Sequence, residues 1–306
     1  MVDFGLTILG NNSAVPAHGR HPTAQVLRHD GDQYLIDCGE GTQFRMQETG
    51  IRQRGLDTIF ISHLHGDHFY GLFGLLNTVH LLSRSKPLNI FGPAGLDAML
   101  NAVLGDRRSR MRFDLIVHEI SDDEPTTLVE TDRMVVSTLP LVHRIPTTGF
   151  LFRERTRPAH IRPEAIRAHG IPHERIEAIR RGADFERPDG TVITHADLTT
   201  PAEPPRSYAY CSDTAFHEEL IDRVNGVDLL YHEATFLAGQ SARAAETFHS
   251  TAEQAARIAH AAGVGRLVLG HFSSRYDDLS PVLAEARAIF PRTELGLEGT
   301  TFDVRI

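Results

Sequence analysis

The stretch that decides the fold is Ile59-Phe60-Ile61-Ser62-His63-Leu64-His65-Gly66-Asp67-His68. It reads as a buried apolar strand that runs directly into three histidines and an aspartate. Neutral imidazole and carboxylate are ligands that zinc and similar divalent metals prefer, and residues i and i+2 at a strand end can converge on one ion. We therefore expect His63 and His65 to share one ion, and Asp67 and His68 to point toward a second.

The HxHxDH pattern of this stretch resembles the metallo-β-lactamase superfamily. The resemblance implies an α/β (α+β) fold, a four-layer αβ/βα sandwich with one or two zinc ions between its two β-sheets. Gly66 and Gly71 are expected to let the backbone turn tightly around the ligands. The motif does not choose a substrate, because that choice depends on the remaining ligands and on what is inserted between them.

Length and composition indicate an ordinary globular protein. The 306 residues, 41% of them hydrophobic, suffice for one large two-layered core or two modest domains. The start of the chain does not resemble a signal peptide, and no apolar run approaches the roughly 20 residues that span a bilayer. A cytoplasmic protein without membrane association is expected, with Cys38 and Cys211 reduced and buried.

Charge is unevenly distributed along the chain. The formal net charge of -9 argues against general affinity for nucleic acid. Between Arg153 and Arg187, however, nine arginines stand against six acidic residues, a local charge of +3 that leaves -12 for the remainder. Prolines break the apolar periodicity from 153 to 206, so we expect this segment to be an insertion, with short helices at 163–169 and 172–181. The alternative is a surface excursion without function.

The remaining sequence alternates between expected strands and expected helices, a rhythm that indicates helices packed on sheets. Strands are expected at 6–9, 24–27, 33–36, 88–91, 113–117, 134–139, 207–211, 227–231 and 265–270. Helices are expected at 42–50, 70–83, 95–104 and 255–262.

Five of the expected strands end in a residue that can bind metal or move a proton: His63, His143, Asp213, His232 and His271. Alone, His143 could equally be a histidine satisfied in the core. Sites assembled at strand ends are the usual way in which a rigid sheet positions chemistry. The recurrence therefore favours His143, Asp213 and His271 as metal ligands.

Three further positions have a structural and a functional interpretation. Asp37, at a strand end, could fix the tautomer of a ligating histidine or simply form a turn. Ser250 and Glu253 have the spacing of a capping box. That cap would place His249 beside a helix N-terminus, which favours a phosphate oxygen, although a chain with 18 histidines could also place one there by accident.

Taken together, six motifs closely resemble the ribonuclease Z family, whose members remove the 3′ trailer from precursor tRNA. They are HLHGDH at 63–68, His143, SDT at 212–214, HEATF at 232–236, FHST at 248–251 and HFSSRY at 271–276. The resemblance covers nearly the whole chain and includes the position of the insertion. A zinc β-lactamase would typically place a cysteine among its ligands, and this chain has none at those positions.

The resemblance implies a role for each residue of the site. One zinc ion is expected on His63, His65 and His143, the other on Asp67, His68 and His271, with Asp213 bridging, although other divalent ions suit the same ligands. Asp67 is expected to orient the attacking water. His249, assisted by Glu233, is expected to protonate the departing 3′ oxygen.

The resemblance further implies that residues 153–206 form a basic arm within a single domain of residues 1–306 and bind tRNA as an exosite. Arg175, Arg180 and Arg181 are the expected contacts, although the Gly-Pro-rich tip of many bacterial members is replaced by Ile171-Pro-His-Glu-Arg-Ile176. A homodimer is also expected.

Two alternatives stay open from the sequence. The first is a dizinc hydrolase of a small phosphodiester or ester, with the same ligands. The second is a non-catalytic, metal-stabilised RNA-binding protein, which would not depend on Asp67 or His249.

Overall fold

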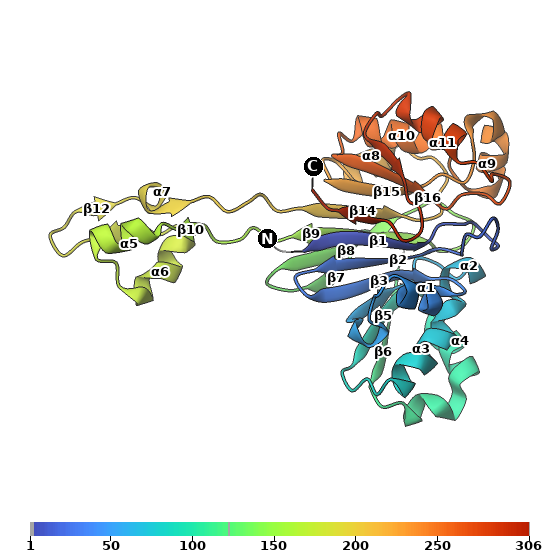
Figure 1. Ribbon diagram of the computed structural model, residues 1–306, viewed down its shortest axis with the longest axis horizontal. Coiled ribbons are helices and arrows are strands. Elements are labelled where there is room, and N and C mark those ends of the chain that lie inside the picture. The colour runs from blue at the N-terminus through green and yellow to red at the C-terminus, as the bar shows by residue number, and fades with distance from the viewer. Residues whose placement is uncertain (1–2, 122, 306) are drawn as a thin grey trace. The chain divides into compact units, whose positions relative to one another are not determined.

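The computed structural model describes residues 3–121 and 123–305. The chain divides into two compact units (Figure 1). The larger, here the sandwich unit, consists of Met1–Val129, Val136–Phe152 and Ser207–Ile306, and the smaller, here the insertion unit, consists of Glu130–Val135 and Arg153–Arg206. Within the described residues, no helix has both the length and the apolar character that a membrane crossing requires.

Two seven-stranded sheets form the sandwich unit. The first runs in the order β18 (Thr301–Asp303), β1 (Phe4–Gly10), β2 (Ala24–His29), β3 (Asp32–Cys38), β4 (Thr58–Phe60), β5 (Leu88–Pro93) and β6 (Leu115–Ile120). The second runs in the order β17 (Thr293–Leu295), β16 (Arg266–Gly270), β15 (Leu229–Glu233), β14 (Ser207–Cys211), β9 (Thr148–Glu154), β8 (Met134–Pro140) and β7 (Thr127–Glu130).

Side-chain alternation along the strands separates two buried layers. Successive side chains of a strand point to opposite faces, so Phe60 of β4 faces the other sheet while Ile59 faces the helices. Between the sheets, the Phe60 ring lies 5.1 Å from that of Phe150, and the Tyr34 ring lies 5.8 Å from that of Phe152. Aromatic rings from both sheets therefore fill the space between them.

Helices cover the outer face of each sheet (Figure 1). The first sheet packs against α1 (Thr42–Glu48), α3 (Gly71–Leu81) and α4 (Leu96–Leu104), while α2 (Gly66–Phe69) contains Asp67 and His68 of the HxHxDH motif. The second sheet packs against α8 (Glu219–Arg223), α10 (Ala252–Ala261) and α11 (Ser280–Arg287), and α9 (Ser241–Thr247) precedes α10. This order of layers is the predicted four-layer αβ/βα sandwich, which is confirmed.

Parallel pairing brings the ends of several strands to one edge of each sheet. In the first sheet β3, β4, β5 and β6 are parallel neighbours. In the second sheet β14, β15, β16 and β17 are parallel neighbours. Because parallel strands end at the same edge, the residues that follow β14, β15 and β16 gather there.

Gly66 and Gly71 do not make the tight turns that the sequence predicted for them. Neither Gly66 nor Gly71 has a positive φ, so neither makes a turn that only glycine permits. A Cβ on Gly71 would instead lie 2.0 Å from the carbonyl oxygen of Gly39, and a Cβ on Gly66 would lie 2.2 Å from the ring of Tyr70. These glycines are needed for close packing rather than for turning.

The insertion unit has a small core of its own, formed by Ala165, Ile171, Ile179, Phe185 and Leu198. Its helices are α5 (Pro163–His169), α6 (His173–Arg180) and α7 (His195–Leu198). Two short antiparallel strand pairs accompany them: β10 (His160–Ile161) pairs with β13 (Thr199–Thr200), and β11 (Phe185–Glu186) pairs with β12 (Val192–Ile193). Across residues 153–206, ten arginines stand against nine acidic residues, so the segment as a whole is only weakly basic.

Some expected boundaries were wrong. Strand β6 begins at Leu115 rather than at 113, and strands β7 and β9 were not expected at all. The capping box is formed by Thr251 and Gln254, one residue after the expected pair of Ser250 and Glu253, because helix α10 begins at Ala252. Ser250 instead donates its hydroxyl to the carbonyl oxygen of Thr214 over 2.8 Å.

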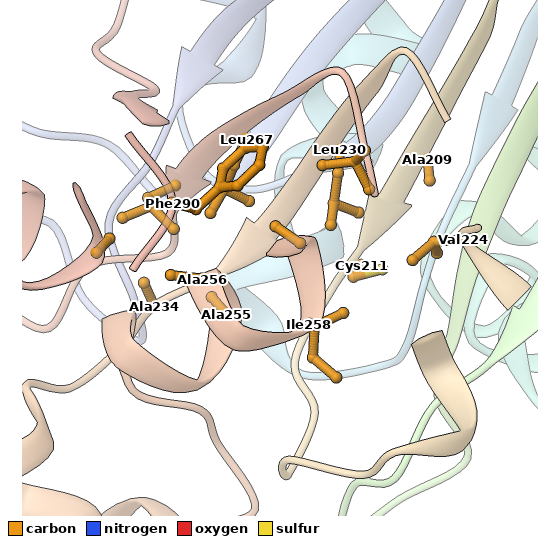
Figure 2. Close-up of a cluster of buried hydrophobic side chains, with 14 of the residues drawn as sticks. Ala209, Cys211, Val224, Leu230, Ala234, Ala255, Ala256, Ile258, Leu267 and Phe290 are labelled. Carbon is orange, nitrogen blue, oxygen red and sulfur yellow. The ribbon is translucent and has the colours of Figure 1, made fainter. Parts of the chain in front are cut away.

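The cluster between the second sheet and its helices gives a test of this packing. Leu230 of β15 is fully buried among Ala209, Ile258 and Leu267 (Figure 2). Leu230→Ala should lower the free energy of unfolding by about 2–5 kcal/mol, because the removed methyl groups leave a cavity. Leu81→Ala is the matched control, since Leu81 is 68% exposed, and should change the free energy of unfolding by less than about 0.5 kcal/mol. Urea unfolding followed by circular dichroism measures both, and equal effects would contradict the assigned packing.

Candidate metal centre

Four side chains from three separate loops form a first group of ligand atoms. His63 and His65 follow β4, His143 follows β8, and Asp213 follows β14. His65 Nδ1 lies 3.0 Å from His63 Nε2 and 3.3 Å from His143 Nε2. Asp213 Oδ2 lies 3.5 Å from His63 Nε2 and 3.9 Å from His143 Nε2. The structure thus brings this part of the predicted site together.

A second group lies on the other side of Asp213. His68 Nε2 lies 3.2 Å from His271 Nε2 and 3.5 Å from Asp67 Oδ2, and His271 Nε2 lies 3.4 Å from that same Asp67 oxygen. The other carboxylate oxygen of Asp213, Oδ1, lies 3.4 Å from His68 Nε2 and 3.1 Å from His271 Nε2. Each oxygen of Asp213 therefore faces a different group.

These separations fit a metal ion better than they fit hydrogen bonds. With zinc–nitrogen bonds of about 2.0–2.1 Å in a tetrahedral site, neighbouring ligand atoms lie roughly 3.3 Å apart. Most of the pairs above fall between 3.0 and 3.5 Å. Asp213 is 2% exposed, and among the described residues its Oδ1 has no hydrogen-bond partner. A buried, unpartnered carboxylate oxygen is costly, and a cation between the two groups would satisfy it.

Hydrogen bonds behind the ligands fix the rings. His143 Nδ1 donates to the carbonyl oxygen of Phe248 over 2.8 Å, and His68 Nδ1 donates to Asp37 Oδ2 over 2.7 Å. His271 Nδ1 lies 2.9 Å from the hydroxyl of Thr235. Since each ring uses Nδ1 in this way, Nε2 is the nitrogen that can bind a metal ion once it carries no proton.

Asp37 has both of the roles that the sequence left open. Its φ of 55° places it in the left-handed turn region at the end of β3. Its carboxylate also accepts hydrogen bonds from the backbone and hydroxyl of Ser62, from His68 Nδ1 and from the hydroxyl of Tyr210. Because Tyr210 belongs to β14, this fully buried carboxylate links both sheets to the ligand stretch.

Burial favours the neutral form of two candidate ligands, whereas at His68 burial is outweighed by the carboxylates of Asp213, Asp67 and Asp37, which raise the pKa well above its ordinary value. Burial lowers the pKa of His65 and of His143 to about 4, so both rings are neutral at physiological pH and can act as ligands. Burial raises the pKa of Asp67, but the charges of His68 and His271 outweigh it and hold that pKa below its ordinary value. Asp67 is therefore ionised.

The loop before β2 holds Asp67 from the other side. The backbone amide of Ala14 donates to Asp67 Oδ2 over 2.7 Å. Ala14 adopts a φ of 62°, which is uncommon for a residue with a Cβ. A non-glycine residue in this region is strained, so the surrounding structure must stabilise the loop in this shape.

His249 and Glu233 form a buried pair beside the ligands. His249 Nδ1 lies 2.8 Å from Glu233 Oε1, and the His249 ring stacks on that of His271 with centroids 5.4 Å apart. Glu233 also accepts hydrogen bonds from the backbone amides of Thr214 and Thr235. Burial lowers the pKa of His249, but the Glu233 carboxylate outweighs it and raises that pKa to about 9. His249 is therefore a proton donor at neutral pH.

His232 does not join either group. Its Nδ1 donates to the carbonyl oxygen of Glu233 over 2.7 Å, so the histidine at the end of β15 has a structural role. The residue at this strand end that faces the site is Glu233.

A cavity of about 520 Å³ opens over the ligands. Asp67, Asp213, His249 and His271 line it together with residues that the sequence did not single out, namely Ser13, Val15, Glu40, Tyr70 and Arg144. Glu40 lies in the Asp37–Thr42 turn and Arg144 directly follows a ligand, so sequence proximity to the motifs was the one signal that could have identified them.

The arginines expected to bind substrate lie on or next to α6 of the insertion unit. Arg180 and Arg181 both pair with Glu177, through contacts of 3.1 and 2.7 Å. Arg175 is exposed, and within the described residues its guanidinium has no ion pair. Exposed ion pairs contribute little stability, so Arg175 and Arg181 can turn to an anionic partner. Arg180 is held more firmly, because its Nε also donates to the carbonyl oxygen of Ala159 over 3.1 Å.

Comparison with known proteins finds relatives along nearly the whole chain. Residues 4–157 match a family model described as the anti-Pycsar protein Apyc1, and residues 199–272 match one described as a β-lactamase superfamily domain. Ribonuclease Z of Bacteroides fragilis strain YCH46 is 46% identical over 298 residues, 97% of this chain and 98% of that protein. Ribonuclease Z of Parabacteroides distasonis is 46% identical over 304 residues, 99% of this chain and 100% of that protein.

A solved structure is also similar over the full length. The human tRNase Z, short form (ELAC1), has a TM-score of 0.71 and 27% sequence identity, with 99% of this chain and 100% of that chain covered. The full-length relatives span both regions that the family models match separately.

The His249–Glu233 pair predicts a pH dependence of the metal-free protein. The folded-state pKa of His249 is about 9, above the ordinary value of 6.5. The pair therefore stabilises the fold fully below about pH 6.5, and this contribution, at most about 3 kcal/mol, is lost as the pH rises through 9. Glu233→Gln should lower the pKa of His249 and reduce the loss of stability between pH 7 and pH 10.

Imidazole nitrogen NMR of the metal-free protein measures this pKa, and the spectrum of His249→Gln identifies the signal. An unchanged His249 titration in Glu233→Gln would show that another group sets its pKa.

Proposed function

The chain belongs to the ribonuclease Z family, and from this premise we propose that its site cuts precursor tRNA with two zinc ions and a histidine acid. It is a hydrolytic endoribonuclease of tRNA 3′ processing, with the metallo-β-lactamase fold. The observation that carries the proposal for the site is Asp213, whose two oxygens face two complete sets of ligands beside the His249–Glu233 pair.

The grouping of the ligand atoms indicates which residues would hold each ion. His63, His65 and His143 would hold one ion, and Asp67, His68 and His271 would hold the other, with Asp213 bridging them. A pair of zinc ions supplies a water acidified to a pKa near ~7 and positive charge for the phosphate. Nitrogen and oxygen ligands at these distances support zinc, and they suit manganese as well.

Asp67 orients the attacking water in this proposal. Asp67 lines the cavity, and its Oδ2 is held by the amide of Ala14, so the carboxylate has a fixed direction. Because its pKa is held below the ordinary value, Asp67 accepts a hydrogen bond from the water rather than acting as a strong base.

His249 donates the proton that the departing 3′ oxygen of the tRNA needs. It lines the same cavity as Asp67, and Glu233 keeps it protonated at neutral pH. This division gives the two ends of the broken bond different partners: the water that attacks phosphorus is held by Asp67, and the leaving oxygen is protonated by His249. The tRNA product then ends in a 3′-hydroxyl.

The insertion unit is proposed to be the family's tRNA-binding arm. Arg175, Arg180 and Arg181 supply guanidinium groups for phosphates, and contacts of this kind position an RNA without reading its bases. Since residues 153–206 are only weakly basic overall, binding depends on these few arginines rather than on a large positive surface. A homodimer is proposed from the family alone.

One assay tests both parts of the proposal: cleavage of a 3′-extended precursor tRNA with mapping of the product ends. We expect one cut after the discriminator base. Asp67→Ala should lower kcat by about 100-fold or more, because the water loses its orientation. Replacement of Arg175, Arg180 and Arg181 by alanine should mainly raise KM, because phosphate contacts are lost.

A chromogenic phosphodiester is the control substrate. It should need Asp67 and be insensitive to the arginine replacements. Hydrolysis of the diester without any cut in the precursor tRNA would instead favour a dizinc hydrolase of small substrates, and tRNA binding without any cut would favour a non-catalytic RNA-binding protein.

A further inference from the structure

The cavity over the metal ligands is rich in carboxylates and holds one arginine. Glu40, Asp67 and Asp213 contribute acidic groups to its lining, and Arg144 contributes the guanidinium. The proposed catalytic scheme gives Arg144 no task. The negative charge of Glu40 would repel a substrate phosphate that enters this cavity. A positively charged side chain in the same lining would offset this repulsion.

The backbone that carries Arg144 is rigid. The neighbouring ring of His143 is fixed by the carbonyl oxygen of Phe248. One residue earlier, the amide of Val142 donates to the hydroxyl of Thr214 over 3.1 Å, and its carbonyl oxygen accepts from the amide of Ala215 over 2.8 Å. These bonds tie the segment to the loop that carries Asp213, so Arg144 starts from a fixed point beside the site.

The side chain of Arg144 is uncommitted. It is exposed, and within residues 3–121 and 123–305 its guanidinium makes no hydrogen bond and no ion pair. Arg20, near the same cavity, differs: it donates to Asn12 and to the carbonyl oxygens of Tyr276 and Asp277. Arg20 therefore supports a loop, whereas all the donors of Arg144 are available to a ligand.

We propose that Arg144 binds the phosphate next to the scissile phosphodiester and so positions the RNA strand across the two ions. This inference rests on the proposed function and deepens it. Asp213 and His271 are buried, whereas Arg144, which lines the same cavity, is exposed, and this exposure suits a neighbouring phosphate rather than the reacting one. The planar guanidinium can donate two parallel hydrogen bonds to one phosphate.

Steady-state cleavage of precursor tRNA by Arg144→Ala tests the proposal. KM should rise about tenfold with kcat within about twofold, as expected when a charged hydrogen bond to bound substrate is lost. The dependence of log kcat/KM on log salt concentration should become shallower by about 0.7–1, the value for one phosphate contact. Arg144→Lys should recover part of the affinity, because it restores the charge without the paired donors.

Arg107→Ala is the matched control. Arg107 is also exposed and without an ion pair among the described residues, but it lines a different cavity, with Phe73 and Val103. The Arg107→Ala variant loses the same charge. Its KM, and the slope of log kcat/KM against log salt concentration, should stay within about twofold of wild type. A similar shift in both variants would mean that net charge alone is responsible and would overturn the proposal.

A small chromogenic phosphodiester separates the remaining outcomes. The loss of kcat/KM in Arg144→Ala should be at least about five times larger for precursor tRNA than for this diester, because the diester has no neighbouring phosphate. An equal loss of kcat on both substrates would place Arg144 at the reacting phosphate and overturn the proposal, as would wild-type kinetics on precursor tRNA. If wild type itself does not cut precursor tRNA, the proposed function fails before this inference is reached.

Discussion

The structure depends on one buried carboxylate. Asp213 is almost fully enclosed, and its Oδ1 makes no hydrogen bond in the part of the chain that the structure describes, which is costly unless a cation satisfies it. Its two oxygens point to ligands from both sheets, since the residues after β4 belong to the first sheet and those after β8 and β16 to the second. The sandwich brings these loops together around Asp213. A bound cation there would satisfy the buried carboxylate.

A second carboxylate, Asp37, makes this arrangement rigid. It accepts from Ser62, His68 and Tyr210, so it connects the end of β3, the ligand stretch and the neighbouring sheet. Breaking such a buried network removes several bonds at once and leaves a charge without partners. The candidate metal ligands are thus held by a layer of hydrogen bonds that needs no bound ion, and the cavity beside them is lined by loops attached to the same strands.

The sequence predicted the fold class and the family correctly, because ligand-type residues directly after apolar strands carry strong information. Residue-level details were less accessible. Ser250–Glu253 and Thr251–Gln254 have the same spacing, and only the true start of α10 at Ala252 decides between them. The reach of Tyr210 to Asp37 depends on sheet packing that no local pattern encodes. The direction of the Arg144 side chain depends on tertiary structure in the same way. The roles of the ligands and of the insertion unit stay predictions.

Anomalous diffraction at the zinc edge, from crystals of the zinc-loaded protein, tests the central claim most directly. The account predicts two peaks in each chain, about 3.5–4 Å apart, with one oxygen of Asp213 bonded to each. Oδ2 should share its ion with His63, His65 and His143, while Oδ1 should share the other with the remaining ligands. A single peak, or two peaks of which one lacks Asp213, would contradict the bridged centre on which the proposed chemistry rests.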